Sequence, residues 1–145
     1  MSDIVVKVAQ LLEEFVAIEA IRKSVFQEEQ GVDPALDFDE YDQVSEQLIA
    51  YLDNQCVGTA RIRYLDEKIA KIERLAVLPT ARGLGIGKKI METAIDVIAF
   101  QNISEVVIHA QEYMKGLHQQ LGFHEVGEVF EEVGIRHVKM ILHIE

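Results

Sequence analysis

Residues 75–89 read Leu-Ala-Val-Leu-Pro-Thr-Ala-Arg-Gly-Leu-Gly-Ile-Gly-Lys-Lys, and the rest of the chain is organised around this stretch. The order of residue types predicts the end of a strand, a short turn, a glycine-rich loop and the start of a helix. Gly83, Gly85 and Gly87 remove three side chains within five residues, so backbone amides are free to face one concavity. The positive end of the helix dipole lies at the same place. The stretch therefore predicts a site for a pyrophosphate.

Two common phosphate-binding loops do not fit this stretch. A P-loop would need a glycine at the position of Arg82 and a serine or threonine at the position of Lys89. A dinucleotide-binding G-x-G-x-x-G loop would need its third glycine at Lys88. Both lysines lie on the first helical turn, where cations are normally unfavourable, and a bound anion would explain them. The simpler alternative is a glycine turn that only starts a helix.

Length and composition indicate one globular domain, residues 1–145. Of the 145 residues, 49% are apolar and 27% are charged, which suits a domain with a core and excludes a disordered chain. The net charge of −11 argues against nucleic acid as a partner and is compatible with a cationic substrate. The single cysteine, Cys56, excludes an internal disulfide and favours a cytoplasmic location. We expect no signal peptide and no membrane association, because no apolar run approaches the ~20 residues of a membrane span.

Hydrophobic periodicity predicts a mixture of strands and helices. Apolar steps of three and four predict a helix over 11–26, interrupted near 17–20, a second helix over 86–98 and a short helix over 112–121. Period-two and β-branched segments predict strands at 4–8, 47–52, 56–64, 68–78, 105–110, 126–131 and 137–144. Because a helix connects the strands at 68–78 and 105–110, we expect these two strands to be parallel.

The strand before the glycine loop changes phase in its middle. Ile72 occupies an even position, whereas Leu75 and Val77 occupy odd positions. A slip of one residue around Glu73-Arg74 would produce this pattern, as a β-bulge does, and would leave backbone groups without strand partners. A chance phase error in a buried strand is the alternative.

An acidic segment, residues 28–46, contains no lysine or arginine. Charge runs of this kind are usually solvated faces, but the segment could instead form an acidic rim that attracts an amine substrate as a cation. Its eight acids are Glu28, Glu29, Asp33, Asp37, Asp39, Glu40, Asp42 and Glu46.

Several segments resemble one enzyme family. The run R-G-x-G-x-G that starts at Arg82, after a strand ending in L-A-V, is similar to the acetyl-CoA loop of the GNAT superfamily of N-acetyltransferases. Residues 109–123 resemble the family's second signature, which ends in F-Y-x-x-x-G-F, with Leu117 at the Phe position and His118 at the Tyr position. Segments 29–31, 58–61 and 134–137 resemble a small bacterial ElaA-like branch of the family.

The resemblance implies an α+β fold of the GNAT type. Such a fold has a single mixed central sheet of about six or seven strands flanked by about four helices, and a splayed, bulged strand that binds acyl-CoA. The implied cosubstrate is acetyl-CoA, and no metal is expected. The residues that the resemblance assigns to its binding are Leu75, Ala76, Val77, Arg82, Gly83, Leu84, Gly85, Ile86, Gly87, Lys88 and Gln111.

Acetyl transfer by direct attack needs a base for the amine and an acid for the leaving thiolate. Glu73, at the predicted bulge, and His109, at the end of its strand, are the candidate bases, and either would act directly or through a water. Both could instead be polar partners within the fold. The family's tyrosine acts as the acid, and His118 would take this role because histidine donates a proton near neutral pH. His118 could instead be a surface histidine.

These observations together predict a cytoplasmic enzyme. It would transfer the acetyl group of acetyl-CoA to a primary amine of a small cationic molecule or a peptide. A non-catalytic CoA-binding module, which the missing tyrosine would favour, and a P-loop-like nucleotide binder are the alternatives. The sequence leaves open which amine is the acceptor and whether the chain forms a homodimer.

Overall fold

The computed structural model describes residues 3–144, which form one mixed sheet of seven strands in the order β1-β2-β3-β4-β5-β7-β6. β4 and β5 are parallel, and the other neighbouring strands are antiparallel. The strands are β1 (Ile4–Val8), β2 (Glu46–Leu52), β3 (Gln55–Tyr64), β4 (Ile69–Val77), β5 (Glu105–Gln111), β6 (His124–Glu132) and β7 (Ile135–His143). The helices are α1 (Leu12–Arg22), α2 (Pro34–Asp37), α3 (Ile86–Phe100) and α4 (Lys115–Gln120), with a π-helix η1 (Lys23–Glu29) and 3-10 turns η2 (Glu40–Gln43), η3 (Pro79–Ala81) and η4 (Glu112–Met114).

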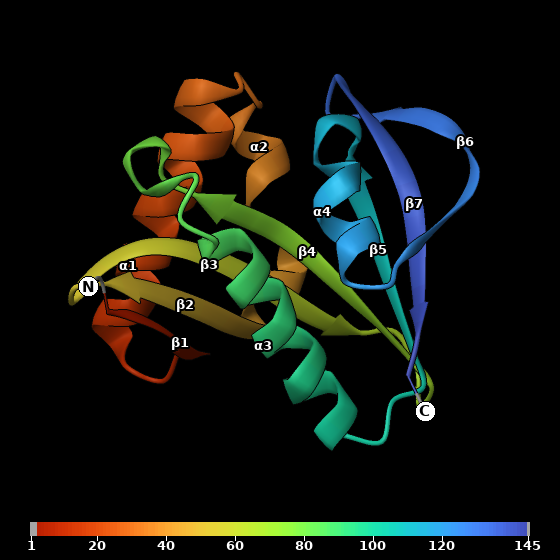
Figure 1. The fold of residues 1–145 in the computed structure, drawn as a ribbon. Helices are drawn as coiled ribbons and strands as arrows, with labels where there is room; N and C mark the ends of the chain where they lie inside the picture. The colour runs from red at the N-terminus through yellow and green to blue at the C-terminus, as the bar shows by residue number, and fades with distance from the viewer. Residues whose placement is uncertain (1–2, 145) are drawn as a thin grey trace.

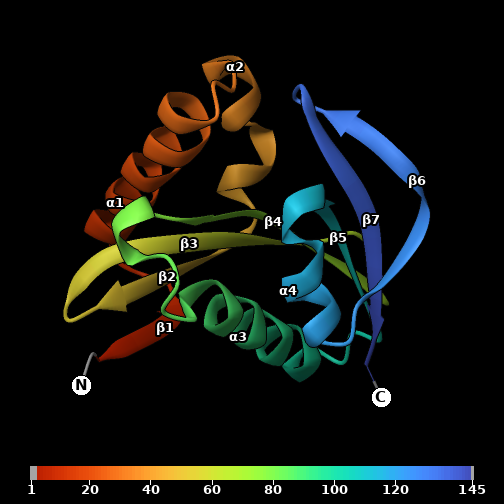
Figure 2. The ribbon, with the colours of Figure 1, turned by 45° about the horizontal axis from the view of Figure 1, so that its top comes forward.

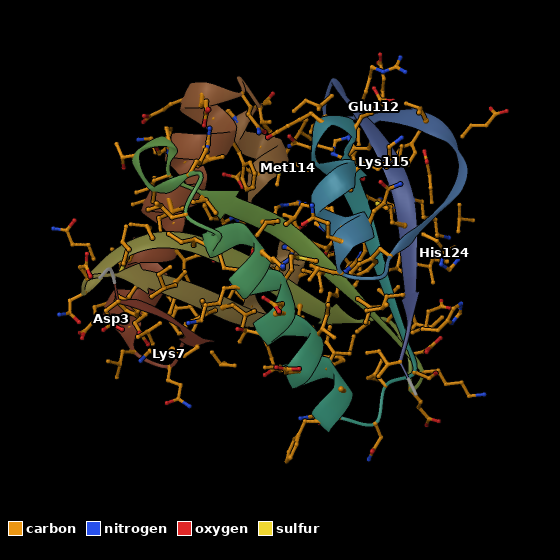
Figure 3. All side chains as sticks on the ribbon, in the orientation of Figure 1. Asp3, Lys7, Glu112, Met114, Lys115 and His124 are labelled. Atoms are coloured by element: carbon orange, nitrogen blue, oxygen red, sulfur yellow. The ribbon has the colours of Figure 1, made fainter. Side chains whose placement is uncertain are left out.

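The helices cover both faces of the sheet. α1 and α2 lie on one face, and α3 and α4 lie on the other (Figure 1, Figure 2). β1, which contains Lys7 and directly follows Asp3, forms one edge of the sheet, and β6, which starts at His124, forms the other (Figure 3). The fold therefore has three layers, with the sheet in the middle.

The larger core lies between α3 and the sheet. The apolar stripe of α3 is buried there, as its steps of three and four predict. Ile90, Ala94 and Ile98 are fully buried against strand residues such as Ile62 and Val106. A smaller core on the opposite face joins η1 to the strand before the glycine loop. The sheet is thus fixed from both sides around β4.

The first helix continues through the position where a break was expected. Residues 17–20 stay helical, and the geometry changes only at Lys23, where the helix widens into η1. The predicted break is wrong because alanines, which favour helix, occupy positions 17 and 20, and Ile18 and Ile21 are buried. Gly31, with a φ of 72°, follows the end of the helical region.

The predicted strands and the helix over 86–98 are confirmed to within two residues at each end, as is the parallel pairing of β4 and β5. The short helix predicted over 112–121 consists of the 3-10 turn η4 followed by α4, which starts only at Lys115. No helix within residues 3–144 combines the length and the apolar character needed to cross a membrane.

Candidate active site

β4 and β5 separate partway along their length. Among the described residues, their parallel pairing runs only from Ile69–Glu105 to Ile72–Ile108. The two strands lie close together near the C-terminus and diverge toward α2 and α4 (Figure 1). Beyond this point β4 is paired only with β3, so the edge formed by residues 73–77 has no strand partner on the side of β5. A free strand edge of this kind accepts an extended ligand as an additional strand.

A bulge in β4 accompanies the separation. Arg61 pairs with Glu73 and Thr59 pairs with Ala76, so β4 has one residue more than β3 between these pairs. Arg74, inside the bulge, has a φ of 57°, which is uncommon for a residue other than glycine. The bulge that the change of phase predicted around Glu73-Arg74 is confirmed.

The separated strands border a cavity of about 520 Å³ that passes through the sheet. Ile72 and Ile108 belong to the core between α3 and the sheet. Because side chains alternate along a strand, their neighbours Lys71, Glu73 and His109 point to the other face of the sheet. We call the two halves the α3 side and the α2 side of the cavity. The α3 side is lined by residues that include Ile86, Gly87, Met91, Met114, Leu117 and His118, and the α2 side by residues that include Leu36, Lys71, Glu73, Arg74 and His109. Met114 is the residue directly before α4 (Figure 3).

The glycine loop, residues 83–87, borders the α3 side of the cavity. Gly83 and Gly85 both have a φ of 79°, and Gly85 is the residue directly before α3. Within residues 3–144, the N–H groups of residues 83–88 donate to no protein acceptor. Six successive free donors at the start of a 15-residue helix form a site for an anion.

Two of the polar side chains predicted to bind CoA, Arg82 and Gln111, already have protein partners. Arg82 donates from Nε to the Val77 carbonyl over 2.9 Å and makes a bidentate pair with Glu29, with both N–O distances at 2.6 Å. Gln111 and Gln30 donate to each other's side-chain oxygens over 3.0 and 3.1 Å. Of the residues predicted to bind the cosubstrate, all but the exposed Leu84 line the cavity.

Glu73 is held by three cations on the α2 side. Its carboxylate lies 2.8 Å from Arg61 Nη2, 3.1 Å from Arg63 Nε and 3.2 Å from Lys71 Nζ. Burial raises the pKa of Glu73, but the charges of Arg61, Lys71 and Arg63 outweigh burial and hold it below its usual range. A carboxylate stabilised in this way is a weak base.

His109, the other candidate base, contacts a carboxylate instead of cations. Its Nδ1 lies 3.3 Å from the Glu132 carboxylate. Because an ionised carboxylate can only accept a hydrogen bond, the neutral His109 ring carries its proton on Nδ1 and its lone pair on Nε2. The hydrogen bond from His109 lowers the pKa of Glu132, which is therefore ionised. The other carboxylate oxygen of Glu132 lies 3.8 Å from Nε2 of the buried His137. This histidine–carboxylate pair is the arrangement that orients a general base.

His118 is buried at the α3 side of the cavity. Only 4% of its surface is exposed, its ring meets the edge of Phe123 at a centroid distance of 5.9 Å, and its Nδ1 has no hydrogen-bond partner among the described residues. Burial lowers the pKa of His118 to about 4. The ring is therefore neutral at physiological pH, and it is not the surface histidine that the sequence left open.

The acidic segment is largely paired with arginines from distant elements. Arg22 contacts Asp37 over 3.1 Å and Asp42 over 2.5 Å, and Arg61 contacts Asp39 over 2.7 Å and Asp42 over 3.0 Å. Both guanidinium groups are 1% exposed. The segment is thus neither a fully solvated face nor a free acidic rim, because buried arginines neutralise its central carboxylates.

Comparison with known proteins identifies the family. The family model described as an acetyltransferase (GNAT) domain matches residues 12–144. The chain belongs to the GNAT acetyltransferase family. YyaT of Bacillus subtilis is 37% identical over 127 residues, which cover 86% of this chain and 85% of YyaT.

The GNAT fold and the ElaA-like branch are both confirmed by relatives. Protein ElaA of Escherichia coli is 29% identical over 129 residues, which cover 86% of this chain and 84% of ElaA. The crystal structure of ElaA matches with a TM-score of 0.83 and 25% identity, covering 97% of this chain and 99% of ElaA. An acyl-CoA N-acyltransferase from Pseudomonas aeruginosa gives the same TM-score at 28% identity, covering 97% of this chain and 99% of that enzyme.

Sequence reasoning missed Glu132 and His137 as neighbours of His109. Glu132 ends β6 and His137 lies on β7, the two strands of the closing hairpin. β7 pairs with β5, with His137 opposite Gln111, and this pairing brings both residues to the cavity. Their only sequence signal was a run of polar residues around a predicted turn. The described residues contain no group of three or more histidines, cysteines or acids placed to hold a metal ion.

Proposed function

We propose that this GNAT protein transfers the acetyl group of acetyl-CoA to a primary amine by direct attack. The observation that carries the proposal is the row of free N–H groups at residues 83–88, beside the unpaired edge of β4. The row would bind the pyrophosphate, and the backbone of residues 75–77 would bind the extended pantetheine as an additional strand. This arrangement supports CoA and disfavours a P-loop nucleotide binder, since the free edge suits an extended chain.

The acetyl group would then lie where the α3 side and the α2 side of the cavity meet. His109 is the better candidate base, because Nε2 has its lone pair free and Glu132 holds the opposite side of the ring. Glu73 is the weaker candidate, because three cations stabilise its ionised form. His109 would take a proton from the ammonium form of the acceptor, directly or through a water.

In the reaction the amine nitrogen bonds to the acetyl carbon and the bond from this carbon to sulfur breaks. The departing thiolate needs a proton. His118, at the position of the family tyrosine, would act as a neutral hydrogen-bond donor to the sulfur, because its pKa of about 4 keeps it from being a cationic acid at neutral pH. The amine's second proton passes through water to the thiolate, and His109 releases the first proton to solvent, so that an amide and the free thiol of CoA result.

The acceptor would be a primary amine of a small molecule or a peptide that is cationic before it loses its proton. The acidic segment supports this less than expected, since Arg22 and Arg61 neutralise Asp39 and Asp42. Glu132 provides a local carboxylate for the ammonium group instead. We also propose a cytoplasmic location, where the lone thiol of Cys56 stays reduced.

The loop is tested by Gly85→Val with Gly127→Val as its matched control. Both glycines have a φ of 79° and open space around the position of a Cβ atom, so both variants carry similar backbone strain. Gly127 lies on β6, outside the cavity lining. We expect Gly85→Val to lose CoA binding in calorimetric titration and Gly127→Val to keep it. Equal CoA affinity in both folded variants would contradict the proposed site.

Catalysis is tested separately by thiol release from acetyl-CoA with a panel of amines. Release that depends on the amine supports the enzyme. CoA binding without thiol release for any amine would favour the non-catalytic CoA-binding module.

A further inference from the structure

We propose that the acceptor carries a carboxylate beside its amine, as an amino acid does, and that Lys71 and Arg74 bind this carboxylate. The proposal rests on the proposed acetyl transfer and names the class of acceptor that the same cavity takes.

Lys71 and Arg74 present donors to the α2 side of the cavity. Both line it, and their side chains are 13% and 25% exposed, so they are shielded from bulk solvent without being closed off. Arg74 donates from Nε to the Asp37 carbonyl over 3.0 Å and from Nη2 to Asp39 over 3.2 Å. Its Nη1 donates to no protein atom within residues 3–144, which leaves N–H groups for a ligand.

The surrounding network has more cations than carboxylates. It contains five cationic side chains (Arg22, Arg61, Arg63, Lys71 and Arg74) and four carboxylates (Asp37, Asp39, Asp42 and Glu73). Burial, followed by the neighbouring charges of Arg61 and Arg22, lowers the pKa of Arg74 against the opposing charges of Glu73 and Asp39. An anionic group next to Arg74 and Lys71 would complete the balance.

Glu132 adds a fifth carboxylate on the α2 side, next to His109. With Glu132 included, positive and negative charges in and around this half of the cavity are equal. An acceptor with only a positive charge would therefore leave an uncompensated charge in a shielded site, which is unfavourable. A zwitterion would place its ammonium group at Glu132 and His109 and its carboxylate at Lys71 and Arg74.

The strand register places the two ends within reach of one small molecule. Lys71 pairs with Val107, and His109 follows two residues later on the same face of β5. Two residues along a strand span roughly 7 Å and neighbouring strands are about 5 Å apart, so the two positions lie within roughly 9 Å of each other. The geometry thus fits an amine and a carboxylate on one compact acceptor.

The test compares the twenty L-amino acids with their α-amides, which have the same side chains but no carboxylate. Thiol release from acetyl-CoA gives kcat/KM for each pair. The amides have less basic amines, so a preference for the acid cannot arise from a larger share of free amine. For the best acceptor we expect the acid to exceed its amide by about tenfold or more, as a charge-assisted contact requires.

Lys71→Met should lower this preference about tenfold, whereas Lys71→Arg, which keeps the charge, should retain it. Lys139→Met is the matched control. Lys139 lies on the same face of the sheet and pairs with His109, but it is exposed and does not line the cavity. We expect this variant to keep the wild-type preference.

Two results would overturn the inference alone: acetylation of carboxylate-free amines as well as or better than acids, or an unchanged preference in Lys71→Met. If neither series is acetylated but another amine of the panel is, the inference fails and the proposed function stands. If no amine gives thiol release, the proposed function fails as well.

Discussion

The buried His118 should make the protein unstable at mildly acidic pH. Burial lowers its pKa from 6.5 to about 4, so between these two values the unfolded chain binds a proton that the folded protein does not. The free energy of unfolding is therefore unaffected by this group above pH 6.5 and falls as the pH drops toward 4. His118→Leu removes the effect, and it also removes a buried nitrogen that lacks a hydrogen-bond partner.

The size of the effect follows from the two pKa values. A shift of one pKa unit corresponds to about 1.4 kcal/mol. The drop in the pKa of His118 from 6.5 to about 4 therefore changes the free energy of unfolding by about 3 kcal/mol over the full pH range. Between pH 7 and pH 4.5 we expect a loss of about 2 kcal/mol in the free energy of unfolding, because the folded protein begins to bind the proton near pH 4.5. The paired carboxylates Glu14 and Asp42 have pKa values of about 2, so they weaken the fold mainly at lower pH.

The assay is urea denaturation at pH 7 and pH 4.5 for wild type, His118→Leu and a control, His124→Asn. His124 is exposed on β6, so its loss should leave the pH dependence unchanged. We expect wild type and the control to lose about 2 kcal/mol more than His118→Leu on acidification. If all three proteins lose the same free energy within about 0.5 kcal/mol, His118 is not buried as a neutral ring and the reasoning is wrong.

Two further predictions concern the charged groups. Glu132→Gln should lower kcat about tenfold or more, because His109 loses the carboxylate that fixes its ring. Steady-state kinetics with the best amine measures this, and an unchanged kcat would exclude His109–Glu132 as the base pair. Asp42→Asn should lower the free energy of unfolding by about 3 kcal/mol, because Arg22 and Arg61 lose a shared partner. Urea denaturation measures this against the exposed neighbour Glu40→Gln, and equal stability of the two variants would refute it.

Features that depend on neighbours in sequence were predictable. The glycine loop follows from three glycines in five residues, and the bulge follows from the odd and even positions of apolar residues around Glu73. Both patterns are local consequences of backbone geometry, so they can be recognised in the sequence without knowledge of the fold. The environment of His118 was not predictable in this way, because its burial depends on how α4 packs against Phe123 and the sheet.

The charge of the cavity shows why the rest needed the structure. The acidic segment has no basic residue of its own, and the whole chain has a net charge of −11, so the sequence favours a negative rim. The buried partners Arg22 and Arg61 come from α1 and β3, and only the fold brings them to Asp39 and Asp42. Electrostatic attraction depends on this local balance, because solvent and salt screen the distant surface acids. The charged groups around the proposed acceptor position are therefore Lys71 and Arg74 on one side and Glu132 on the other, and this favours an acceptor that carries both charges.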